Sequence, residues 1–423
     1  MRVLLVQSYL GGAEPLVYPI GLASIAACIK KHELKGIDLN LHKNPYDELR
    51  RVLSEFSPQA VLVSLRNIDS TNKRKVVFYY KFFKDALKAI RQASAGRIIV
   101  GGSGFSMYAR EIMDDEETID AGVFLEGENI IAGLLDNLDA PLRVKGVFYR
   151  QDGHVMFSGA PPQADLNRTT LPDRTIFPAS AYKATPDAIG IETKRGCALK
   201  CIYCIYGFLN GRSYRLRSPR LIADEIEALS SHGIAEFTFV DSVFNIPMKH
   251  ADEIMREILR RGLKVRWSAW FSEAGIRKDF IDLAIKAGCT KIILSPDGFG
   301  DKALKKLEKN ITNSDIIRTF EVLNGIQGFE LCYNFFKNPP GQTFKDFLAM
   351  LKFALKAKRK MKNRVHFEFN SMRIEPHTKL YDIALSEGFV KKGENLLFPR
   401  YYTSPRTRYI ERFFNGMLAL KGK

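Results

Sequence analysis

Residues 192–208 read ETKRGCALKCIYCIYGF and contain three of the six cysteines in this 423-residue chain. Cys197, Cys201 and Cys204 have a C-x3-C-x2-C spacing and follow a short apolar segment. Three thiolates this close together can bind three irons of a [4Fe–4S] cluster, whose complete ligation by cysteine needs a fourth. The next cysteine, Cys289, lies far along the chain. The spacing therefore predicts an iron–sulfur cluster with one iron open to an outside ligand.

Two other interpretations of the three cysteines are open. A structural zinc ion is usually bound by two separated pairs of ligands, and no second Cys or His pair follows close by. The three residues could also be unrelated buried cysteines. This is the weakest interpretation, because cysteine is rare in the chain and the run is flanked by Gly196 and Tyr203.

The sequence around the cysteines alternates between strand and helix patterns. Six apolar strand candidates occupy residues 188–196, 236–242, 264–271, 291–299, 329–336 and 366–374. Amphipathic stretches, such as residues 221–233 and 280–288, separate them. Six such repeats predict an α/β fold with a partial (β/α)6 barrel over residues 185–385, whose site lies at the carboxyl ends of the strands. The cysteines would then lie on the first of these strand-to-helix loops.

The first third of the chain shows a similar alternation. Strand candidates occupy residues 2–7, 59–65, 96–102 and 121–129, and helical stretches occupy residues 19–31, 75–92 and 130–138. This order predicts a parallel sheet with right-handed crossovers, and hence a doubly wound, Rossmann-like N-terminal domain over residues 1–142. Residues 143–184 are expected to form a hairpin around Asp152-Gly153, followed by a proline-rich linker. Residues 386–423 are expected to form a small C-terminal element.

Composition narrows the class of protein. Hydrophobic residues make up 46% and charged residues 26% of the chain, as in ordinary globular proteins. The 64 Lys and Arg residues against 47 Asp and Glu residues give a net charge of +17, which raises the question of a nucleic-acid or membrane-surface partner. The N-terminus lacks a signal-peptide pattern, and no run of about 18 apolar residues occurs. We therefore expect a cytoplasmic protein with reduced thiols and no membrane span.

The cysteine motif, with Tyr203 before its last cysteine, resembles the C-x3-C-x-aromatic-C signature of the radical S-adenosylmethionine (SAM) superfamily. The resemblance implies that Cys197, Cys201 and Cys204 are the metal ligands and catalytic residues of a [4Fe–4S] cluster. The open iron would bind the amino and carboxylate groups of SAM. Reductive cleavage would then yield methionine and a 5′-deoxyadenosyl radical, which abstracts hydrogen from a substrate. The same resemblance places Tyr203 near the adenine.

Further segments resemble the branch of that superfamily with an N-terminal cobalamin domain. These segments are residues 211–219, 236–245, 338–343 and 375–388. The resemblance implies that Asp241 and Ser242 contact the SAM amino group. It also assigns Ser295 and Asp297 of the SPDG stretch to cofactor binding, although the family usually has Glu at this point. The simpler alternative for Asp241 and Asp297 is a helix N-cap or a loop carboxylate.

Three motifs of the N-terminal third recur in cobalamin-binding domains of this branch: PIGLASIAA, VGGSG and EGEN. The ends of neighbouring parallel strands are where ligands bind in such folds, and glycine lets the backbone approach a bulky cofactor. The residues expected to bind cobalamin are Ser64, Arg66, Asn67, Gly101, Gly102, Ser103, Glu126, Gly127 and Glu128.

The loop after the first strand, residues 7–13, has no histidine. The resemblance therefore implies that no protein histidine binds the cobalt, as in the methylating members of the branch. Arg66 would either lie near the lower face of the corrin or pair with Asp69.

The resemblance as a whole implies a cobalamin-dependent radical SAM methyltransferase. It would methylate an unactivated carbon, or phosphorus, of a small molecule or peptide. Its electron donor would be a protein such as flavodoxin or ferredoxin. Ring contraction or cyclisation, and a non-enzymatic role as a cluster or cofactor carrier, are the alternatives. An RNA-modifying methylthiotransferase is not expected, because that branch has three further cysteines in its N-terminal domain and only Cys28 is present here.

Other candidate features have simpler explanations. The basic run 351–364 is expected to be the solvated face of an amphipathic helix, so nucleic acid is not an expected partner. Tyr333, Asn334 and Asn370 lie near strand ends and could line a substrate pocket, as could Trp270 and Phe271. Packing in the barrel core is the favoured explanation for these side chains.

Overall fold

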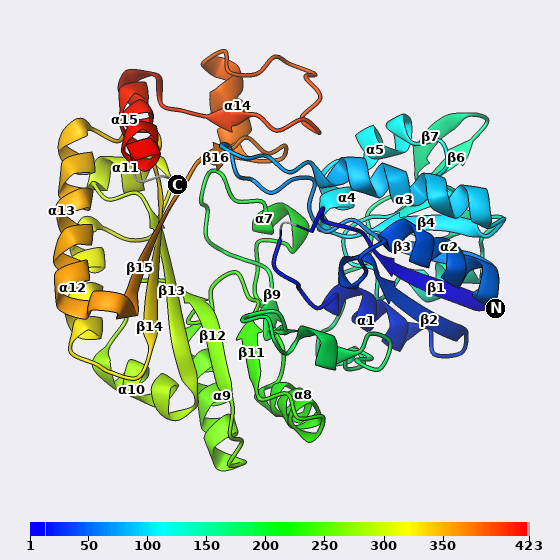
Figure 1. Ribbon diagram of the computed structural model, residues 1–423, viewed down its shortest axis with the longest axis horizontal. Helices are drawn as coiled ribbons and strands as arrows, with labels where there is room; N and C mark the ends of the chain where they lie inside the picture. The colour runs from blue at the N-terminus through cyan, green and yellow to red at the C-terminus, as the bar shows by residue number, and fades with distance from the viewer. Residues whose placement is uncertain (13, 421–423) are drawn as a thin grey trace. The chain divides into compact units, whose positions relative to one another are not determined.

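The computed structural model describes residues 1–12 and 14–420, and it separates the chain into two units, Met1–Gly190 and Ile191–Lys423. Each unit is built on its own sheet, with strand order β2-β1-β3-β4-β5-β6-β7 in the first and β15-β14-β13-β12-β11-β8 in the second (Figure 1). Mixed α/β architecture with parallel sheets confirms the fold class expected from the sequence.

The elements of the first unit follow the predicted alternation. They are β1 (Arg2–Gln7), α1 (Ile20–Cys28), β2 (Glu33–Asp38), η1 (Leu39–Leu41), α2 (Pro45–Phe56), β3 (Ala60–Ser64), α3 (Tyr79–Ala93), β4 (Arg97–Gly101), α4 (Ser103–Met107), α5 (Ala109–Asp115), β5 (Ala121–Val123), α6 (Ile131–Leu135), η2 (Pro141–Arg143), β6 (Val147–Gln151), β7 (His154–Phe157) and η3 (Ala179–Tyr182).

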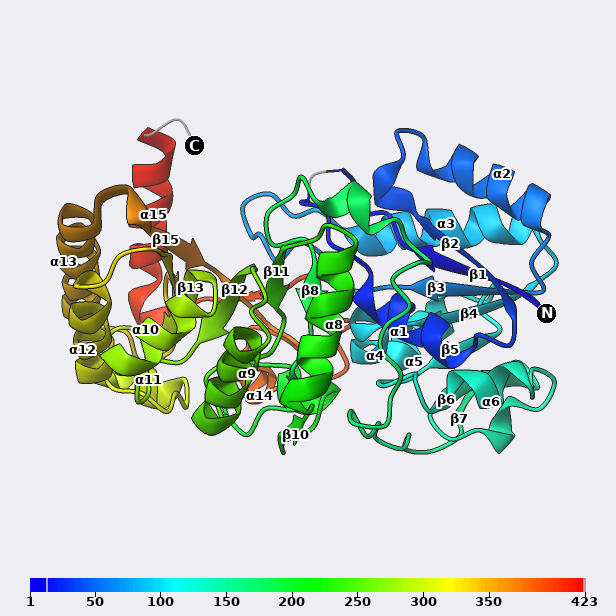
Figure 2. The same cartoon turned by 90° about the horizontal axis from the view of Figure 1, so that it is seen from below.

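Strands β1 to β5 pair in parallel in the order 2-1-3-4-5. Helices α2 and α3 cover one face of this sheet and α1 and α6 the other (Figure 2). Residues Val3–Val6 of β1 are therefore fully buried, as expected for a strand covered on both faces. The order of connection reverses between β1 and β3, which is where folds of this type bind their ligands.

Two features of the first unit differ from the sequence expectation. Strand β2 and helix α2 were not predicted, because ELKGID contains no apolar run and PYDELRRVLSEF is mostly polar. The hairpin β6–β7 turns at Asp152-Gly153 as predicted, but it pairs with β5 and so extends the sheet instead of beginning a linker.

The proline-rich segment after the hairpin is packed onto its own unit. The Tyr182 hydroxyl donates to Asp38 Oδ2 at 2.6 Å, and Tyr18 makes edge contacts with Phe177 and Tyr182. The backbone N–H of Asp173 donates to the carbonyl of Ala23. These contacts fix the segment in place, so it is not the free linker that its composition suggested.

The second unit contains the predicted six-stranded arrangement. Its elements are β8 (Gly190–Ile191), β9 (Lys194–Arg195), α7 (Tyr206–Leu209), β10 (Arg215–Leu216), α8 (Pro219–Ser231), β11 (Glu236–Phe239), α9 (Met248–Arg260), β12 (Arg266–Phe271), α10 (Lys278–Lys286), β13 (Cys289–Asp297), α11 (Asp301–Lys306), α12 (Asn313–Asn324), β14 (Glu330–Phe336), α13 (Phe344–Met361), η4 (Lys362–Arg364), β15 (Val365–Asn370), β16 (Met372–Arg373), α14 (Lys379–Ser386), β17 (Tyr401–Tyr402), η5 (Pro405–Thr407) and α15 (Arg408–Leu420).

Strands β11 to β15 form one parallel ladder, with β8 beside β11 at one edge. Helices α10, α12 and α13 lie along one side of β13, β14 and β15 (Figure 1). Alternate residues of the strands pack beneath these helices. For example, the ring of Tyr333 stacks on Phe335 and Phe367 and meets Phe353 of α13 edge-on. The open sheet leaves all strand carboxyl ends at one rim, as the barrel prediction requires.

The C-terminal residues are part of the second unit. Strand β17 pairs with β16, and Phe414 of α15 contacts Phe347 and Phe369. Among the described residues, none of the helices combines the length and apolar character that crossing a membrane would need.

Candidate cluster and cofactor site

The cysteine loop begins directly after β9 and is anchored at both ends. Strand β9 pairs with β10 through Arg195 and Arg215, and the N–H of Cys197 donates to the carbonyl of Gly211 at 3.0 Å. Gly196 has a φ of 91°, and a Cβ at this position would collide with the carbonyl of Ser213. A glycine before the first cysteine is therefore required for the loop to close.

The three thiols of the loop are buried or half-buried and carry no disulfide. Burial raises the pKa of Cys201, and it raises the pKa of Cys204 to about 12. The negative charges of the neighbouring cysteines raise both pKa values further, while the charge of Lys309 lowers them. Without a metal the Cys201 and Cys204 thiols are thus protonated, and binding of iron must displace their protons.

The arrangement fits an iron–sulfur cluster better than a single ion. Within the part of the chain that the structure describes, no three Cys, His, Asp or Glu side chains are arranged around one metal ion. A zinc site needs its ligands to converge on a single point. In a cluster each thiolate binds a different iron, so three nearby but separate sulfurs suffice.

Asp241 lies at the end of β11, beneath the cysteine loop, and its carboxylate is fully engaged. Oδ1 accepts from the N–H groups of Thr193 (2.8 Å) and Lys194 (3.3 Å), and Oδ2 accepts from the Thr193 hydroxyl and from Lys194 Nζ (3.0 Å). Both charged side chains are almost completely inaccessible to solvent. Contact of Asp241 with SAM stays a prediction. The contacts observed here favour a positioning role for it, and the hydroxyl of Ser242 donates to the Gly196 carbonyl at 3.4 Å.

A second polar cluster joins the cysteine loop to the end of β13. The Tyr203 hydroxyl donates to Asp297 Oδ2, and the same oxygen accepts from Lys309 Nζ at 2.8 Å. Lys309 Nζ also donates to the carbonyl of Ser295 at 2.7 Å. The Ser295 hydroxyl accepts from Asn334 Nδ2 at 3.2 Å. Of the predicted cofactor residues, the structure thus brings together Tyr203, Ser295 and Asp297.

The backbone at the end of β13 is shaped to aim Asp297 at Tyr203. The pairing of β13 with β14 shifts register between Leu294 and Asp297, and Asp297 has a left-handed φ of 64°. Irregular strand ends and left-handed non-glycine residues are costly and concentrate at functional sites. This bulge explains why the stretch reads SPDG and not a regular strand.

Of the candidate pocket residues, Asn334 and Trp270 lie outside the aromatic core, whereas Tyr333 and Phe271 lie within it. Asn334 points to the same side of β14 as Phe336, whose ring meets that of Tyr203 edge-on at 4.8 Å. Trp270 is 36% exposed. Tyr333 and Phe271 instead pack in the aromatic core, as the simpler explanation predicted. Asn370 accepts a backbone hydrogen bond from Lys337 through its carbonyl.

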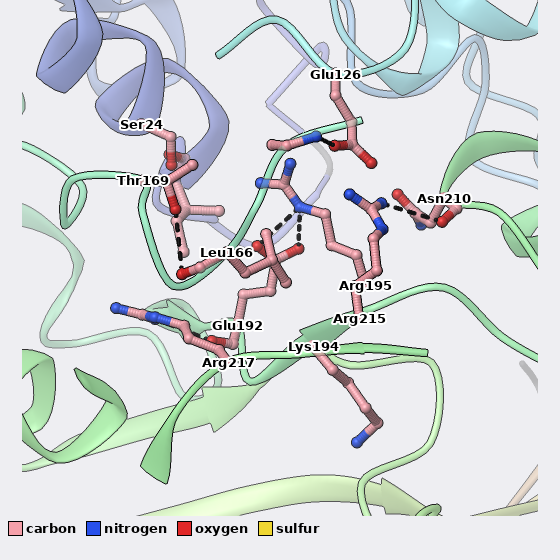
Figure 3. A network of polar contacts seen from close by, with 12 residues as sticks. Ser24, Glu126, Leu166, Thr169, Glu192, Lys194, Arg195, Asn210, Arg215 and Arg217 are labelled. Atoms are coloured by element: carbon pink, nitrogen blue, oxygen red, sulfur yellow. Dashed lines mark hydrogen bonds and ion pairs between the residues drawn. The ribbon is translucent and has the colours of Figure 1, made fainter. Parts of the chain in front are cut away.

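Two ion pairs between arginine and glutamate hold the strands on either side of the cysteine loop. Glu192 accepts two hydrogen bonds from Arg195 Nε, at 2.9 and 3.0 Å (Figure 3). Arg217 donates to the Glu192 carbonyl and forms a buried ion pair with Glu225 at 2.5 Å. These pairs hold β9 and β10 and so fix the position of the cysteine loop.

Charged residues near the site that sequence reasoning missed include the buried Lys194 and Glu273 and the largely covered Lys309. From sequence, a lysine outside an apolar run is expected at the surface. Only the acidic residues Asp241 after β11 and Asp297 at the end of β13 could have suggested that a lysine is buried beside them. Glu273 follows β12 and is 2% exposed, and its Oε1 has no hydrogen-bond partner among the described residues. Burial raises the pKa of Glu273 to about 7, opposed by the charge of Lys309 and assisted by Asp297 and Asp315.

The raised pKa of Glu273 predicts a pH-dependent stability. The folded protein binds a proton at this carboxyl more tightly than the unfolded chain, so stability falls as pH rises from about 4.5 to about 7. A shift of this size corresponds to about 3 kcal/mol. In Glu273→Gln that part of the dependence is expected to disappear, measured by urea unfolding between pH 5 and 8. The exposed Glu330→Gln is the control, and equal pH profiles for the two variants would contradict the assignment.

The cobalamin residues predicted in the first unit meet at the carboxyl ends of three adjacent strands. Ser64 of β3 is in register with Gly101 of β4, and the Leu65 N–H donates to the Gly101 carbonyl at 2.9 Å. The Ser103 hydroxyl donates to the Arg66 carbonyl at 2.6 Å. Asn67 follows in the same loop.

The third strand end contributes Glu126, Gly127 and Glu128, which follow β5. Glu126 Oε2 accepts the N–H of Ala164 at 2.9 Å (Figure 3), and a Cβ on Gly127 would lie 2.7 Å from Ile25 Cδ1. Ser64, Gly101, Gly102, Ser103 and Gly127 are small residues at neighbouring strand ends, and Ser64 ends β3, one of the two strands between which the strand order reverses. Such an edge fits a bulky planar ligand such as cobalamin. The roles of the individual residues stay predictions.

Gly102 is the position of this edge most sensitive to substitution. Its φ is 101°, and a Cβ would lie 2.6 Å from the Leu65 carbonyl oxygen. Gly102→Ala is therefore expected to destabilise the first unit by about 1–3 kcal/mol and to lower cobalamin retention on gel filtration. Gly133→Ala in α6 is the matched control, since its Cβ would lie at an ordinary 3.7 Å from the nearest atom and the residue is not among those expected to bind cobalamin. Equal cobalamin retention by both variants would refute the placement of the cofactor here.

Comparisons with known proteins agree with this geometry. A family model for the radical SAM superfamily matches residues 191–354, and a B12-binding domain model matches residues 8–135. The chain is 24% identical over 383 residues to the uncharacterized methyltransferase PH0819 of Pyrococcus horikoshii, covering 88% of this chain and 79% of that protein. It is 22% identical over 350 residues to the tryptophan 2-C-methyltransferase of Streptomyces laurentii, covering 67% and 58%.

Among solved structures, the chain resembles the radical SAM methyltransferase TsrM of Kitasatospora setae with cobalamin and a [4Fe–4S] cluster bound. The TM-score is 0.79 at 21% identity, covering 96% of this chain and 83% of that one. At this level of identity the likeness shows a shared fold.

The chain combines a radical SAM domain over residues 191–354 with an N-terminal B12-binding domain over residues 8–135, which marks it as an enzyme. This pair of domains confirms the predicted family and the three predicted cofactors: a [4Fe–4S] cluster, SAM and cobalamin.

Proposed function

We propose that the protein transfers a methyl group from SAM, by way of cobalamin, to an unactivated carbon or phosphorus of a small molecule or peptide. One observation carries this proposal: the same chain contains two suitable sites. The first is the cysteine loop that Gly196 allows to close at the rim of the barrel, and the second is the edge of strand ends suited to cobalamin. The similarity to proteins named as methyltransferases supports it. An acidic electron donor such as flavodoxin or ferredoxin, in the cytoplasm, suits the +17 charge.

When bound, the cluster would supply the electron that cleaves SAM, and cobalamin would carry the methyl group. The protein's residues supply position and exclusion of water. Cys197, Cys201 and Cys204 would hold three irons, and Asp241 with Lys194 would keep the loop at the rim. Tyr203, near the adenine, and Asp297, to which its hydroxyl donates, are the proposed SAM contacts in the barrel.

Methyl transfer can be tested without knowing the substrate. The anaerobically reconstituted protein, loaded with cobalamin, is incubated with a chemical reductant such as dithionite and with SAM labelled in its methyl group. The proposal expects label in the cobalamin fraction, which mass spectrometry detects. Cleavage of SAM without labelled cobalamin would instead indicate a ring-contracting or cyclising enzyme. Absence of both reactions in protein that retains its cofactors would favour a carrier.

A further inference from the structure

Lys309 is a buried cation that reaches the cysteine loop from a different part of the barrel. It follows α11, and its side chain is only 11% exposed. Its ammonium group donates to Asp297 Oδ2 (2.8 Å) and to the Ser295 carbonyl (2.7 Å), and it lies 3.4 Å from the Tyr203 hydroxyl oxygen. An ammonium group has three donors, so these contacts account for all of them.

The backbone beside Lys309 is attached to the same loop. The Leu307 carbonyl accepts the N–H of Ile202, between two of the cysteines, at 3.1 Å. Glu308 has a left-handed φ of 53° and pairs with Lys379 at 2.8 Å. The Ile202 carbonyl in turn accepts the N–H of Leu380. The turn at residues 307–309 thus contacts the cysteine loop through both backbone and side chain.

The charge of Lys309 is balanced first by Asp297 at the end of β13. Burial opposes the charged form of this lysine, but Asp297 outweighs burial and raises the pKa of Lys309, and Cys201 adds to this effect when it is a thiolate. The ammonium group therefore keeps its charge, and its contact with Tyr203 places that charge beside the loop segment between Cys201 and Cys204. A group buried this deeply keeps its charge only when anions compensate for lost hydration.

We propose that Lys309 is a positioning residue for the cysteine loop, and that its buried positive charge makes the bound cluster easier to reduce. Reduction adds one electron to a site already rich in thiolate charge, so a nearby cation stabilises the reduced form more than the oxidised form. Net charge and hydrogen bonding near the sulfurs are known determinants of cluster potential. The inference rests on the proposed function, since it requires the cluster to bind at this loop.

The test is an EPR-monitored redox titration of the reconstituted protein without SAM or substrate. Lys309→Met is expected to lower the ratio of reduced to oxidised cluster at least tenfold at the wild-type midpoint, which is about 59 mV for a one-electron couple. Lys309→Arg keeps the charge and is expected to stay near the wild-type value. Lys305→Met removes an exposed charge of α11 and is the matched control.

Each outcome decides the inference. Full iron content with the same potential in Lys309→Met and Lys305→Met would overturn it. Loss of iron in Lys309→Met but not in Lys309→Arg would support the positioning role through charge. Loss of iron in both Lys309 variants would assign the lysine to packing alone and would also overturn the inference. Failure of the wild-type protein to bind a cluster would instead refute the proposed function.

Discussion

Cys201→Ala is expected to lose the cluster and, with it, all reductive cleavage of SAM. Cys201 is the middle ligand of the loop and is 8% exposed, so neither water nor another cysteine can replace its thiolate. The nearest sequence alternatives, Cys289 and Cys332, lie on β13 and β14 and are buried there. Iron content after anaerobic reconstitution and the yield of 5′-deoxyadenosine from SAM measure the effect. Both are expected to fall to the level of a protein-free control.

Cys332→Ala is the matched control for this substitution. It removes a buried thiol of the same unit, whose only polar contact among the described residues is with the neighbouring Asn334 side chain at 3.8 Å. Iron binding and SAM cleavage should persist in this variant. If Cys201→Ala kept both, or if Cys332→Ala lost both, the assignment of the cluster to the loop would be wrong.

Lys194→Met is expected to cause the largest loss of stability. Removing one member of a buried ion pair leaves the other charge uncompensated and typically costs about 3–5 kcal/mol. Lys194 and Asp241 have side chains 1% and 0% exposed, and Lys194 Nζ also donates to the Phe244 carbonyl at 3.0 Å. Thr193 can still donate its two hydrogen bonds to Asp241 in the variant, but the positive charge of Lys194 is lost. The free energy of unfolding in urea is the measurement.

The exposed Lys249→Met provides the comparison for Lys194→Met, since the Lys249 side chain is 89% exposed. A loss of less than about 1 kcal/mol in Lys194→Met, the typical value of a surface pair, would contradict the bracing role of Asp241. If the variant were stable but bound SAM more weakly, Asp241 would act as the SAM contact that the family resemblance implies.

The sequence predicted most of the architecture because the strands are strongly apolar. Strands β1, β3 and β4 coincide with runs such as RVLLVQ and RIIVG, whose burial on both faces of the sheet leaves a clear pattern, whereas the edge strand β15 is covered only at alternate positions. Strand β2 was missed because it lies at a sheet edge, where ELKGID needs little apolar surface. The hairpin β6–β7 was recognised, but its addition to the first sheet depends on long-range pairing that local patterns do not report.

The sequence predicts those parts of the candidate site whose chemistry requires a particular residue type. It does not predict residues whose importance depends on being buried in the folded protein. Three cysteines at a fixed spacing indicate a cluster by themselves, and glycine pairs at strand ends indicate a ligand edge. Nothing in the sequence marks Lys309 as buried, because its partners Asp297 and Tyr203 lie 12 and 106 residues away. Glu273 likewise looks like a solvated loop residue until the position of α12 is known, whose Thr319 hydroxyl donates to the Glu273 carbonyl.

The most direct test of the account is the cofactor content of the protein reconstituted anaerobically with iron, sulfide and cobalamin. The account predicts about four irons and one cobalamin per chain, with cleavage of SAM on reduction. Iron is expected to depend on Cys201 and cobalamin retention on Gly102. Protein that binds iron and cleaves SAM but retains no cobalamin would contradict the account, because the first unit would then serve a different ligand.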